Sequence, residues 1–519
     1  MRLEHIAISH FQGIKSLSLP LEAASTLIAE NTWGHRSFIN ALYKVMGPDG
    51  VDAVFENGDF YQGGDQLQLV LTFVEGHGGH WRRLRYRPLR TLMWGQADGH
   101  MRLRLGWFAQ KGQGSQLRFL GQDGQPLDDQ QQTPRLARHL LTLHPVLRLG
   151  FPDADHLSQL PWLRELLEAP EQFEEQELQE GLDSVKALLS RYFTSPVRQR
   201  PRDRNAIARQ PINWAAIRTL EQVLNQSANR QTRLAMLGLF GVLMHTQDAK
   251  PFARLARPLL LLDMPEARLH PVMLATFWSL VVQLPLPRLL LTQSSELLGA
   301  QDLLSIRRLV RRQGELHCYR LHHALREDDY RRIGFHLRVN RPASLFARCW
   351  LLVEGETEIW LMSELAHLAG VHLAAEGIRV IDFAQCGLKP LLHLTRDLGI
   401  GVHVLCDGDE AGDRYAAQVR GLLGDRAEAS LTQLPAKDVE HFFYQEGYQE
   451  LFTRLARWHQ AHGSPSQVIR AAISRQSKPE LALRIAEEAG KRGKEGVPVL
   501  LRRLFSQLRQ SALASAPKD

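Results

Sequence analysis

The sequence has few cysteines and no long hydrophobic run. Its 519 residues include only Cys318, Cys349, Cys386 and Cys406, and no two of them have C-x-x-C spacing. This excludes a zinc ribbon and a disulfide framework, and it fits the reducing cytosol. The leucine-rich segment 258–263 is too short to span a bilayer. The opening residues MRLEHIAISHFQGI lack the basic-then-apolar order of a secretory signal. We therefore expect a cytoplasmic protein with no membrane segment.

Length and charge indicate the number of domains and the kind of partner. A chain of 519 residues is too long for one hydrophobic core, so two or three domains are expected. The formal net charge is +7 and the sequence pI is about 9.3, a modest excess that is compatible with a polyanionic partner and equally with an ordinary soluble protein. Internal repeats and low-complexity tracts are absent from the sequence.

The most informative stretch runs from Trp350 to Gly412. It contains the apolar runs WLLVEG, IRVIDF and VHVLCDGD, each of strand length and each followed by small or acidic residues. Such runs are typical of buried parallel strands, whose carboxyl ends meet at one edge of the sheet, where ligands of open α/β sheets bind. We expect the acids that follow the first and third runs to meet there.

Those acids are Glu354 and Glu358 after the first run, and Asp407 and Asp409 after the third. Four carboxylates at one edge repel one another unless a divalent cation holds them, and oxygen-only ligands favour Mg²⁺ or Mn²⁺ over zinc. The alternative is a flavodoxin-like or Rossmann domain whose acidic loops only cap helices. The combination EG-x-x-E, then D-x-D, resembles a Toprim domain, the metal-binding module of topoisomerases, primases and certain nucleases.

The first half of the chain predicts a mixed α/β architecture. Residues 3–21 alternate apolar and polar side chains, as in a β-hairpin or meander, and 66–75, 81–88 and the segment to about 120 indicate further antiparallel strands. Helical periodicity begins near Pro134. The acidic run 171–180 predicts a solvated helix face or a dimerising arm, and the basic segment 197–210 predicts either a phosphate-contacting loop or a plain linker.

The segment TLIAENTWGHRSFINAL resembles the nucleotide-binding loop of ABC-type ATPases of the SMC, Rad50 and RecF group, whose pattern is G-x-N-x-x-G-K-[ST]. Asn31, Gly34 and Ser37 are retained, but Ala29 replaces the first glycine, His35 the lysine, and Arg36 the metal-binding hydroxyl residue. Such a loop needs its lysine on the phosphates and its hydroxyl on the metal. Ser37 comes one position too late, and a guanidinium does not reproduce a hydroxyl ligand.

Three further segments follow in the order of that ATPase group. LLLLDMPEARLHP resembles a Walker B strand and D-loop, in which Asp263 keeps the metal-associated acid and Met264 takes the place of the water-activating glutamate. LLLTQSSELL resembles the switch strand with Gln293 in place of histidine, and 224–237 occupies the place of a signature motif without its glycines. We expect a preserved scaffold in which ATP hydrolysis is very slow or absent, and the sequence leaves open whether ATP is bound.

An ABC-type half followed by a Toprim domain resembles the OLD (overcoming lysogenization defect) nucleases in their YbjD-like form. The resemblance implies an α/β fold class with three parts: an ABC-type ATPase-like domain at 1–341 with a helical, dimerising insertion at about 134–210, a Toprim domain at 342–435, and a helical extension at 436–519 that completes the nuclease site. It assigns a further metal-binding acid to Glu440, with Asp438 as the alternative, and an assisting lysine to Lys478, which otherwise only starts a helix before Pro479.

The implied activity is metal-dependent DNA endonuclease chemistry with two Mg²⁺ or Mn²⁺ ions. Glu354, Asp407 and Asp409 are assigned to one ion, and Glu358 and Glu440 to the other, with Lys478 stabilising the transition state. The expected partners are DNA and a second copy of the chain; a partner helicase cannot be named. From a different class, a non-catalytic RecF-like DNA clamp or repair protein would keep the scaffold without the chemistry.

Overall fold

A computed structural model describes residues 1–29, 32–47, 50–127, 132–149, 257–267, 286–312, 315–322, 326–458 and 463–515, with single positions between 271 and 282. It has two compact units. Unit 1 comprises Met1–Gln301, Ser305–Leu309 and Gly314–Cys318, and unit 2 comprises Asp302–Leu304, Val310–Gln313 and Tyr319–Asp519. In the described part, no helix is both long and apolar enough to cross a membrane.

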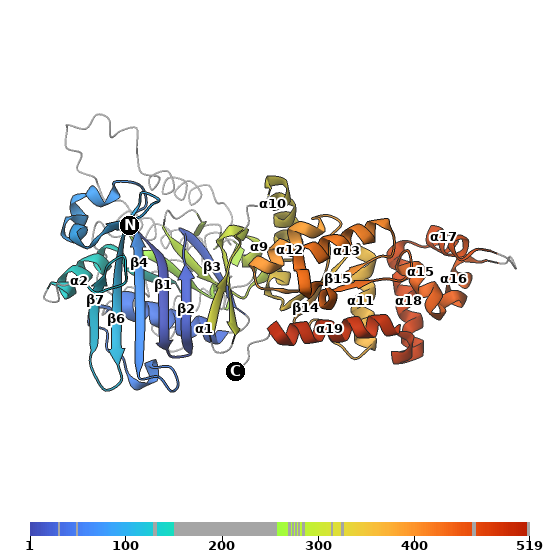
Figure 1. Ribbon diagram of the computed structural model, residues 1–519, viewed down its shortest axis with the longest axis horizontal. Helices are drawn as coiled ribbons and strands as arrows, with labels where there is room; N and C mark the ends of the chain where they lie inside the picture. The colour runs from blue at the N-terminus through green and yellow to red at the C-terminus, as the bar shows by residue number, and fades with distance from the viewer. Residues whose placement is uncertain are drawn as a thin grey trace, which may run out of the picture. The chain divides into compact units, whose positions relative to one another are not determined.

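Unit 1 is built on a mixed sheet, which includes twelve strands among the described residues (Figure 1). The order is β5-β6-β4-β1-β2-β12-β11-β3-β10-β9-β8, with β7 beside β6. These strands are β1 (Arg2–Phe11), β2 (Ile14–Pro20), β3 (Ala24–Ala29), β4 (Gln66–Val74), β5 (Trp94–Gly95), β6 (Met101–Gln110), β7 (Ser115–Leu120), β8 (Val146–Leu149), β9 (Leu259–Asp263), β10 (Arg288–Leu291), β11 (Ile306–Arg312) and β12 (Glu315–Tyr319). One part is antiparallel (β1, β2, β4–β7), and β8, β9, β10, β3 and β11 pair in parallel.

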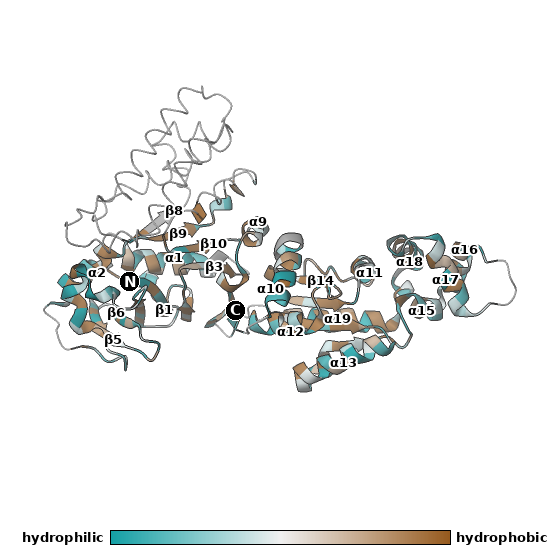
Figure 2. Cartoon of the chain, turned by 90° about the horizontal axis from the view of Figure 1, so that it is seen from above, coloured by the Kyte–Doolittle hydropathy of each residue, from teal (hydrophilic) through white to brown (hydrophobic). Residues whose placement is uncertain are grey.

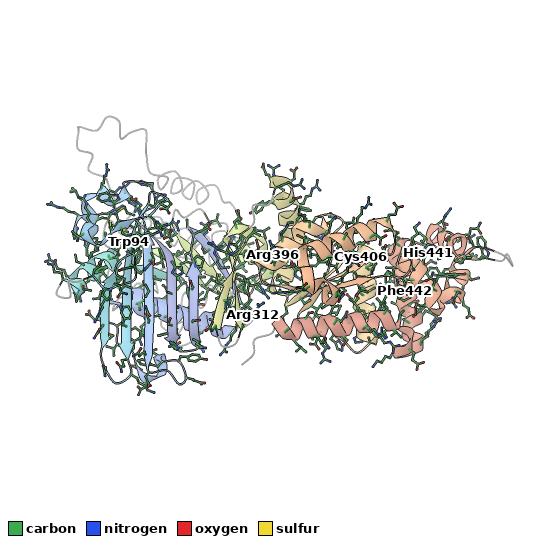
Figure 3. The ribbon with its side chains drawn as sticks, viewed as in Figure 1. Trp94, Arg312, Arg396, Cys406, His441 and Phe442 are labelled. Carbon is green, nitrogen blue, oxygen red and sulfur yellow. The ribbon has the colours of Figure 1, made fainter. Side chains whose placement is uncertain are left out.

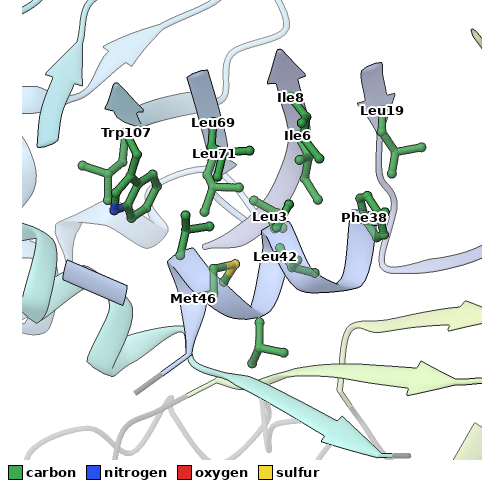
Figure 4. Close-up of a cluster of buried hydrophobic side chains, with 14 of the residues drawn as sticks. Leu3, Ile6, Ile8, Leu19, Phe38, Leu42, Met46, Leu69, Leu71 and Trp107 are labelled. Carbon is green, nitrogen blue, oxygen red and sulfur yellow. The ribbon is translucent and has the colours of Figure 1, made fainter. Parts of the chain in front are cut away.

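The predicted opening hairpin is confirmed, because β1 pairs with β2 in antiparallel register. Helix α1 (Thr32–Met46) covers this sheet and repeats apolar side chains at four-residue spacing through Phe38, Leu42 and Met46. Figure 4 shows this face of α1 against strand residues such as Leu71 and Trp107, and all five side chains are buried. A strand and an amphipathic helix, β3 and α1, therefore flank the segment that resembles a nucleotide-binding loop.

One predicted strand is wrong. Residues 81–88 form no strand but belong to two 3-10 helices, η3 (His80–Arg82) and η4 (Leu84–Leu92). Tyr86 and Leu89 are buried three residues apart, which is the 3-10 period, whereas a strand would bury alternate residues. Pro88, inside η4, has no N–H for a strand ladder. Gly79, with φ of 79°, turns the chain into η3.

The other elements of unit 1 are α2 (Thr133–Leu143), η1 (Gly50–Asp52), η2 (Asn57–Asp59), η7 (Pro265–Ala267) and α9 (Ser295–Gly299). Strands β9 and β10 lie where the sequence predicts buried strands, and β8 was not predicted. Most of the helical insertion, the basic segment 197–210 and the signature-like segment 224–237 lie outside the described residues.

Unit 2 contains a four-stranded parallel sheet of order β14-β13-β15-β16. Its strands are β13 (Cys349–Val353), β14 (Ile378–Asp382), β15 (Gly401–Cys406) and β16 (Leu431–Gln433), connected by α11 (Glu356–Leu368), α12 (Leu388–Asp397), α13 (Glu410–Leu423), η11 (Gly424–Arg426) and α14 (Ala427–Ser430). All five side chains of β13 are buried, as expected for a strand covered on both faces. Figure 2 shows hydrophilic and hydrophobic residues alternating along α13, which is typical of a helix with one solvated face.

Helices precede and follow this sheet. Before it come η8 (Leu303–Ser305), α10 (Glu327–Ile333), the π-helix η9 (Gly334–Asn340) and η10 (Pro342–Phe346); after it come α15 (Val439–Phe443), the π-helix η12 (Tyr444–Tyr448), α16 (Gln449–Ala456), α17 (Pro465–Arg475), α18 (Lys478–Arg492), η13 (Gly493–Gly496) and α19 (Val499–Ser515). Side chains of β13 share one hydrophobic core with those of α15–α19. The α/β class, the parallel sheet and the helical final part are therefore confirmed. The boundaries after 341 and 435 stay predictions.

Candidate functional site

Two neighbouring strands of unit 2 end in carboxylates. Strand β13 ends at Val353, directly before Glu354, and its neighbour β15 ends at Cys406, directly before Asp407. The backbone N–H of Asp407 donates a hydrogen bond of 2.9 Å to Oε1 of Glu354. The parallel order of the strands thus brings together two residues that are 53 positions apart in the sequence.

The other two predicted acids of this edge lie in the first turns of the helices that follow. Asp409 is the N-cap of α13 and accepts a hydrogen bond of 2.8 Å from the N–H of Gly412. Glu358, in the first turn of α11, accepts one of 3.1 Å from the N–H of Gly355. The helix-capping alternative considered from the sequence therefore describes part of what these acids do. Each of the two still has a second carboxylate oxygen.

The electrostatics at this edge oppose ionisation. Burial, together with the nearby charges of Glu354, Glu358, Asp438 and Glu440, raises the pKa of Asp407 to about 8. The pKa of Glu354 is raised by burial and by Asp409, although the N–H of Asp407 opposes the shift. Since all these groups are acids, a bound cation would relieve the repulsion that raises their pKa values.

Glu440 and Asp438 reach the same cluster from α15. Burial and the charge of Asp438 raise the pKa of Glu440, whose side chain is buried. Asp438 caps α15 through the N–H of His441 (2.8 Å) and also contacts its ring Nδ1 (2.6 Å). The other ring nitrogen of His441 lies 3.1 Å from Oγ of Ser466 in α17. Figure 3 labels His441 on α15 and Cys406 at the end of β15.

The sequence analysis missed His441 and Ser466. Its only available signal was a D-x-x-H spacing at the start of a helix, which does not reveal a partner 25 residues away. The contacts with both ring nitrogens hold the imidazole between Asp438 and α17. His441 therefore orients the alternative acid, Asp438.

Lys478 is a cation whose charge acts on the second pair of predicted ligands. It is the first residue of α18, it is exposed, and Ser477 caps the helix through the N–H of Glu480. Its ammonium charge lowers the pKa values of Glu358 and Glu440, in opposition to their burial. Lys478 thus starts a helix and also acts electrostatically on the carboxylate cluster.

Two glycines of the DGDEAG loop are required by packing. A Cβ on Gly408 would lie 2.5 Å from the carbonyl oxygens of Leu434 and Ala436, and one on Gly412 would lie 2.0 Å from the carbonyl oxygen of Asp407. The N–H of Gly408 also donates to the carbonyl of Ala436 at 2.9 Å. The loop therefore fits closely against the segment after β16, and any larger residue would displace it.

The donor set fits a hard divalent cation, although it is not arranged around one. Within the described ranges, no three or more His, Cys, Asp or Glu side chains form a group that could hold a metal ion. Glu354, Glu358 and Asp409 each accept a hydrogen bond from a backbone N–H with one oxygen. Carboxylate oxygens are nevertheless the ligands that Mg²⁺ and Mn²⁺ prefer, and this edge carries several carboxylates close together.

In unit 1, the loop that resembles a nucleotide site carries little charge. His35 lies within the first turn of α1 and is fully buried, with neither ring nitrogen hydrogen-bonded in the described structure. Burial lowers its pKa to about 4, against the opposing charge of Asp263. The ring is therefore neutral near pH 7. Gly34 and Ser37 are also buried and Arg36 is exposed, while Asn31 lies outside the described residues.

Two acids, Asp263 and Glu266, lie at the end of β9 and in η7, which follows it. Asp263 ends β9, and Met264 follows in the left-handed region with φ of 43°. The strand does not continue, so Glu266 turns toward the end of β10. Its Oε1 accepts hydrogen bonds from Thr292 Oγ1 (2.9 Å), Gln293 N (2.6 Å) and Ser294 N (3.2 Å). Glu266 thus joins the loops after β9 and β10.

Comparisons with known proteins agree with this two-part architecture. Residues 1–344 match a family described as "Protein of unknown function (DUF2813)", and residues 345–409 match the "Overcoming lysogenization defect protein-like, TOPRIM domain". The chain is 42% identical over 545 aligned positions to "Uncharacterized protein YbjD" of Escherichia coli strain K12, with 98% of each chain covered.

Solved structures give weaker similarities. The C-terminal region of the Xanthomonas campestris pv. campestris OLD protein is 16% identical, with a TM-score of 0.28, covering 33% of this chain and 96% of that one. The SMC head domain from Thermotoga maritima is 12% identical, with a TM-score of 0.31, covering 62% of this chain and all of that one. The matches to the two families and to YbjD over nearly the full length carry the assignment: the chain belongs to the DUF2813 family and carries an OLD-like Toprim domain.

Proposed function

We propose that the protein is a metal-dependent DNA endonuclease that hydrolyses phosphodiester bonds at the carboxylate edge of unit 2. The observation that carries the proposal is the surplus of negative charge at this edge, where the pKa of Asp407 is raised to about 8 by burial and by four neighbouring acids. Crowded carboxylates do not stabilise a fold that binds no ligand, whereas a site for divalent cations needs several carboxylates close together.

The proposed ligands fall into two sets. Glu354, Asp407 and Asp409 would hold one Mg²⁺ or Mn²⁺ ion, and Glu358 and Glu440 would hold the second, with Asp438 as the alternative to Glu440. When bound, the ions supply positive charge beside the scissile phosphate and favour ionisation of water near neutral pH. To bind them, the carboxylates have only to offer their second oxygens or rotate away from the backbone N–H groups.

The remaining chemistry belongs to the protein itself. The Lys478 ammonium acts on Glu358 and Glu440 and is exposed, so it can approach a phosphate oxygen and stabilise the extra negative charge of the transition state. His441 holds Asp438 in place. Hydrolysis needs no covalent intermediate on a side chain, so no catalytic tyrosine is required.

A non-catalytic DNA clamp is the second candidate. It is favoured by the same hydrogen bonds that use one oxygen each of Glu354, Glu358 and Asp409, since these give the acids a structural role. In that case the acids would cap helices and join loops, and metal would have no effect on DNA.

Plasmid nicking separates the two candidates. We expect supercoiled DNA to be converted to nicked circles in Mg²⁺ or Mn²⁺ and to stay intact in chelator. ATP should have little effect, because the nucleotide loop lacks its charged lysine. Equal nicking by the wild-type protein and Asp407→Ala would identify a contaminating nuclease, and the clamp would then be the better description.

A further inference from the structure

The segment between β4 and β5 in unit 1 concentrates positive charge. Residues 82–90 contain the five arginines Arg82, Arg83, Arg85, Arg87 and Arg90, and the sequence has no acidic residue between Glu75 and Asp98. They lie in and around η3 and η4, beside the first residue of the chain in Figure 1. Neither the nuclease chemistry nor the nucleotide loop uses this segment.

Buried side chains of η4 anchor this segment to the core of unit 1. Tyr86 and Leu89 are fully buried in the core of unit 1, and the hydroxyl of Tyr86 lies 3.1 Å both from the Met1 nitrogen and from Nε2 of His144. Since these residues hold η4 against the core, Arg83 and Arg87 are directed to the exposed side. The arginines therefore occupy defined positions on a supported surface.

Aromatic rings and carbonyl groups also fix the guanidinium groups. Those of Arg82 and Arg90 lie 5.7 Å and 5.6 Å from the Trp81 ring centre. Arg90 also donates hydrogen bonds to the carbonyl oxygens of Trp81 (3.4 Å) and Arg82 (2.5 Å). Such contacts restrict the side chains before any ligand binds, which reduces the entropy lost on binding.

The arginines of this cluster repel one another and the amine at the start of the chain. In the described part of the chain, Arg82, Arg83, Arg87 and Arg90 form no ion pair with a carboxylate. Burial and neighbouring arginines, Arg85 first, lower the pKa of the Met1 amine to about 5, and burial and Arg85 lower the pKa of Arg83. Cations that repel one another in this way gain free energy from a multivalent anion.

We infer that this arginine cluster, Arg82, Arg83, Arg85, Arg87 and Arg90, binds the phosphodiester backbone of DNA. A 3-10 helix rises about 2.0 Å per residue, so Arg85 and Arg90 of η4 lie roughly 10 Å apart along its axis. Arg82 and Arg83, which precede η4, extend the cluster further. One DNA strand carries a phosphate about every 3.4 Å along the axis, so the part in η4 alone corresponds to about three phosphates. The row is longer than the phosphates of one nucleotide and suits a polymer. The inference rests on the proposed function in taking DNA as the substrate.

Salt-dependent DNA binding tests the inference without cleavage. The full-length protein, in chelator, is titrated into a fluorescein-labelled 30-base-pair duplex, and anisotropy is recorded at several KCl concentrations. Arg83→Gln with Arg87→Gln should make the slope of log K against log salt less negative by about 1.8, because each lost phosphate contact contributes about −0.9. At 0.1 M salt the affinity should fall on the order of tenfold or more.

Two matched variants complete the test. Lys111→Gln with Arg118→Gln removes the same charge from the hairpin of β6 and β7, and it should leave the slope close to that of the wild type. Arg83→Lys with Arg87→Lys keeps the charge and should restore most of the slope.

An unchanged slope in the glutamine double variant overturns the inference, as does an equal loss in the hairpin control. A loss of affinity for RNA but not for DNA also overturns it. Since cleavage is not measured, failure of the nuclease proposal alone would leave the binding result interpretable.

Discussion

In both units, buried parallel strands end at acidic residues, but the groups around these acids differ between the two sheet edges. At the edge of unit 2, the carboxylates raise one another's pKa values, and Lys478, the cation that acts on Glu358, is exposed. At the corresponding edge of unit 1, Glu266 is held by three hydrogen bonds from the β10 loop, and His35 of the loop that resembles a nucleotide site is buried and neutral.

The two sheet edges differ in how far contacts within the fold offset the negative charge of their acids. Hydrogen bonds from Thr292, Gln293 and Ser294 hold Oε1 of Glu266 within the fold, which gives this acid a structural role, while its Oε2 is buried and makes no hydrogen bond among the described residues. In unit 2, single N–H donors reach Glu354, Glu358 and Asp409, and the repulsion around Asp407 persists. Unrelieved charge therefore marks the edge where chemistry is expected.

The largest expected effect is on DNA cleavage, which should respond to a mutation at the edge of unit 2 but not to the matched mutation in unit 1. Asp407→Asn should reduce metal-dependent DNA cleavage on the order of a thousandfold, since charge stabilisation by a bound ion contributes several kcal/mol. Asp263→Asn, the matched change at the end of β9, should leave cleavage within a few-fold of the wild type. Initial rates of plasmid nicking measure both. A similar loss in the two variants would mean that the edges work together.

The next effect concerns nucleotide turnover. Because Met264 takes the place of the water-activating acid and His35 is uncharged, ATP hydrolysis should be on the order of a hundredfold or more slower than in an ATPase with an intact loop. Phosphate release in Mg²⁺ measures it. Rapid hydrolysis that disappears in Asp263→Ala would show that unit 1 is an active ATPase. Binding of ATP without turnover agrees with the prediction.

A smaller effect tests the structural role of Glu266. Glu266→Gln removes the charge from an acceptor of three hydrogen bonds, which should cost about 1–3 kcal/mol of unfolding free energy. Thermal unfolding gives the change. The control is Glu296→Gln, an exposed acid in the first turn of α9, which should cost only a few tenths of a kcal/mol. Equal shifts would show that the contacts of Glu266 contribute little.

The last comparison is the response of the two units to pH, which should be opposite in sign. The folded pKa of Asp407, about 8, lies above its ordinary value of 3.8, so the folded state binds more protons and metal-free unit 2 loses stability as pH rises from about 4 to 8. The Met1 amine has a folded pKa of about 5, below its ordinary 8.0, so unit 1 loses stability as pH falls from about 8 to 5.

Hydrogen exchange read peptide by peptide, corrected for the intrinsic pH dependence, measures both trends. Adding Mg²⁺ should flatten the trend in unit 2 only. Parallel trends in the two units would contradict the assigned pKa causes.

Much of the fold follows from local pattern. The alternation in β1 and β2 and the continuous apolar run of β13 predict those strands, because period and burial are visible in the sequence. The segment 81–88 misleads, since its arginines and apolar residues look like alternation until the burial of Tyr86 and Leu89 shows a three-residue period. Strand β8 is only four residues long and has no comparable pattern.

The sequence predicts which residues form the candidate site but not the contacts that hold them in place. Spacing and parallel-strand logic place Glu354 beside Asp407, and the resemblance to OLD nucleases adds Glu440 and Lys478. The contact of His441 with Ser466, and the turn of Glu266 toward β10, depend on how separate elements pack. Sequence spacing does not contain that information.

The shared core of unit 2 has a consequence for protein synthesis. Strand β13 packs in one core with Leu501, Leu504 and Phe505 of α19, and Lys478 is made well after the sheet. At about 5–20 residues per second, a ribosome needs roughly ten to thirty seconds to extend the chain from Glu354 to α19. During that time the nascent chain has its acidic loops but neither Lys478 in place nor a completed core. We therefore expect the edge to be complete only after translation has passed α19.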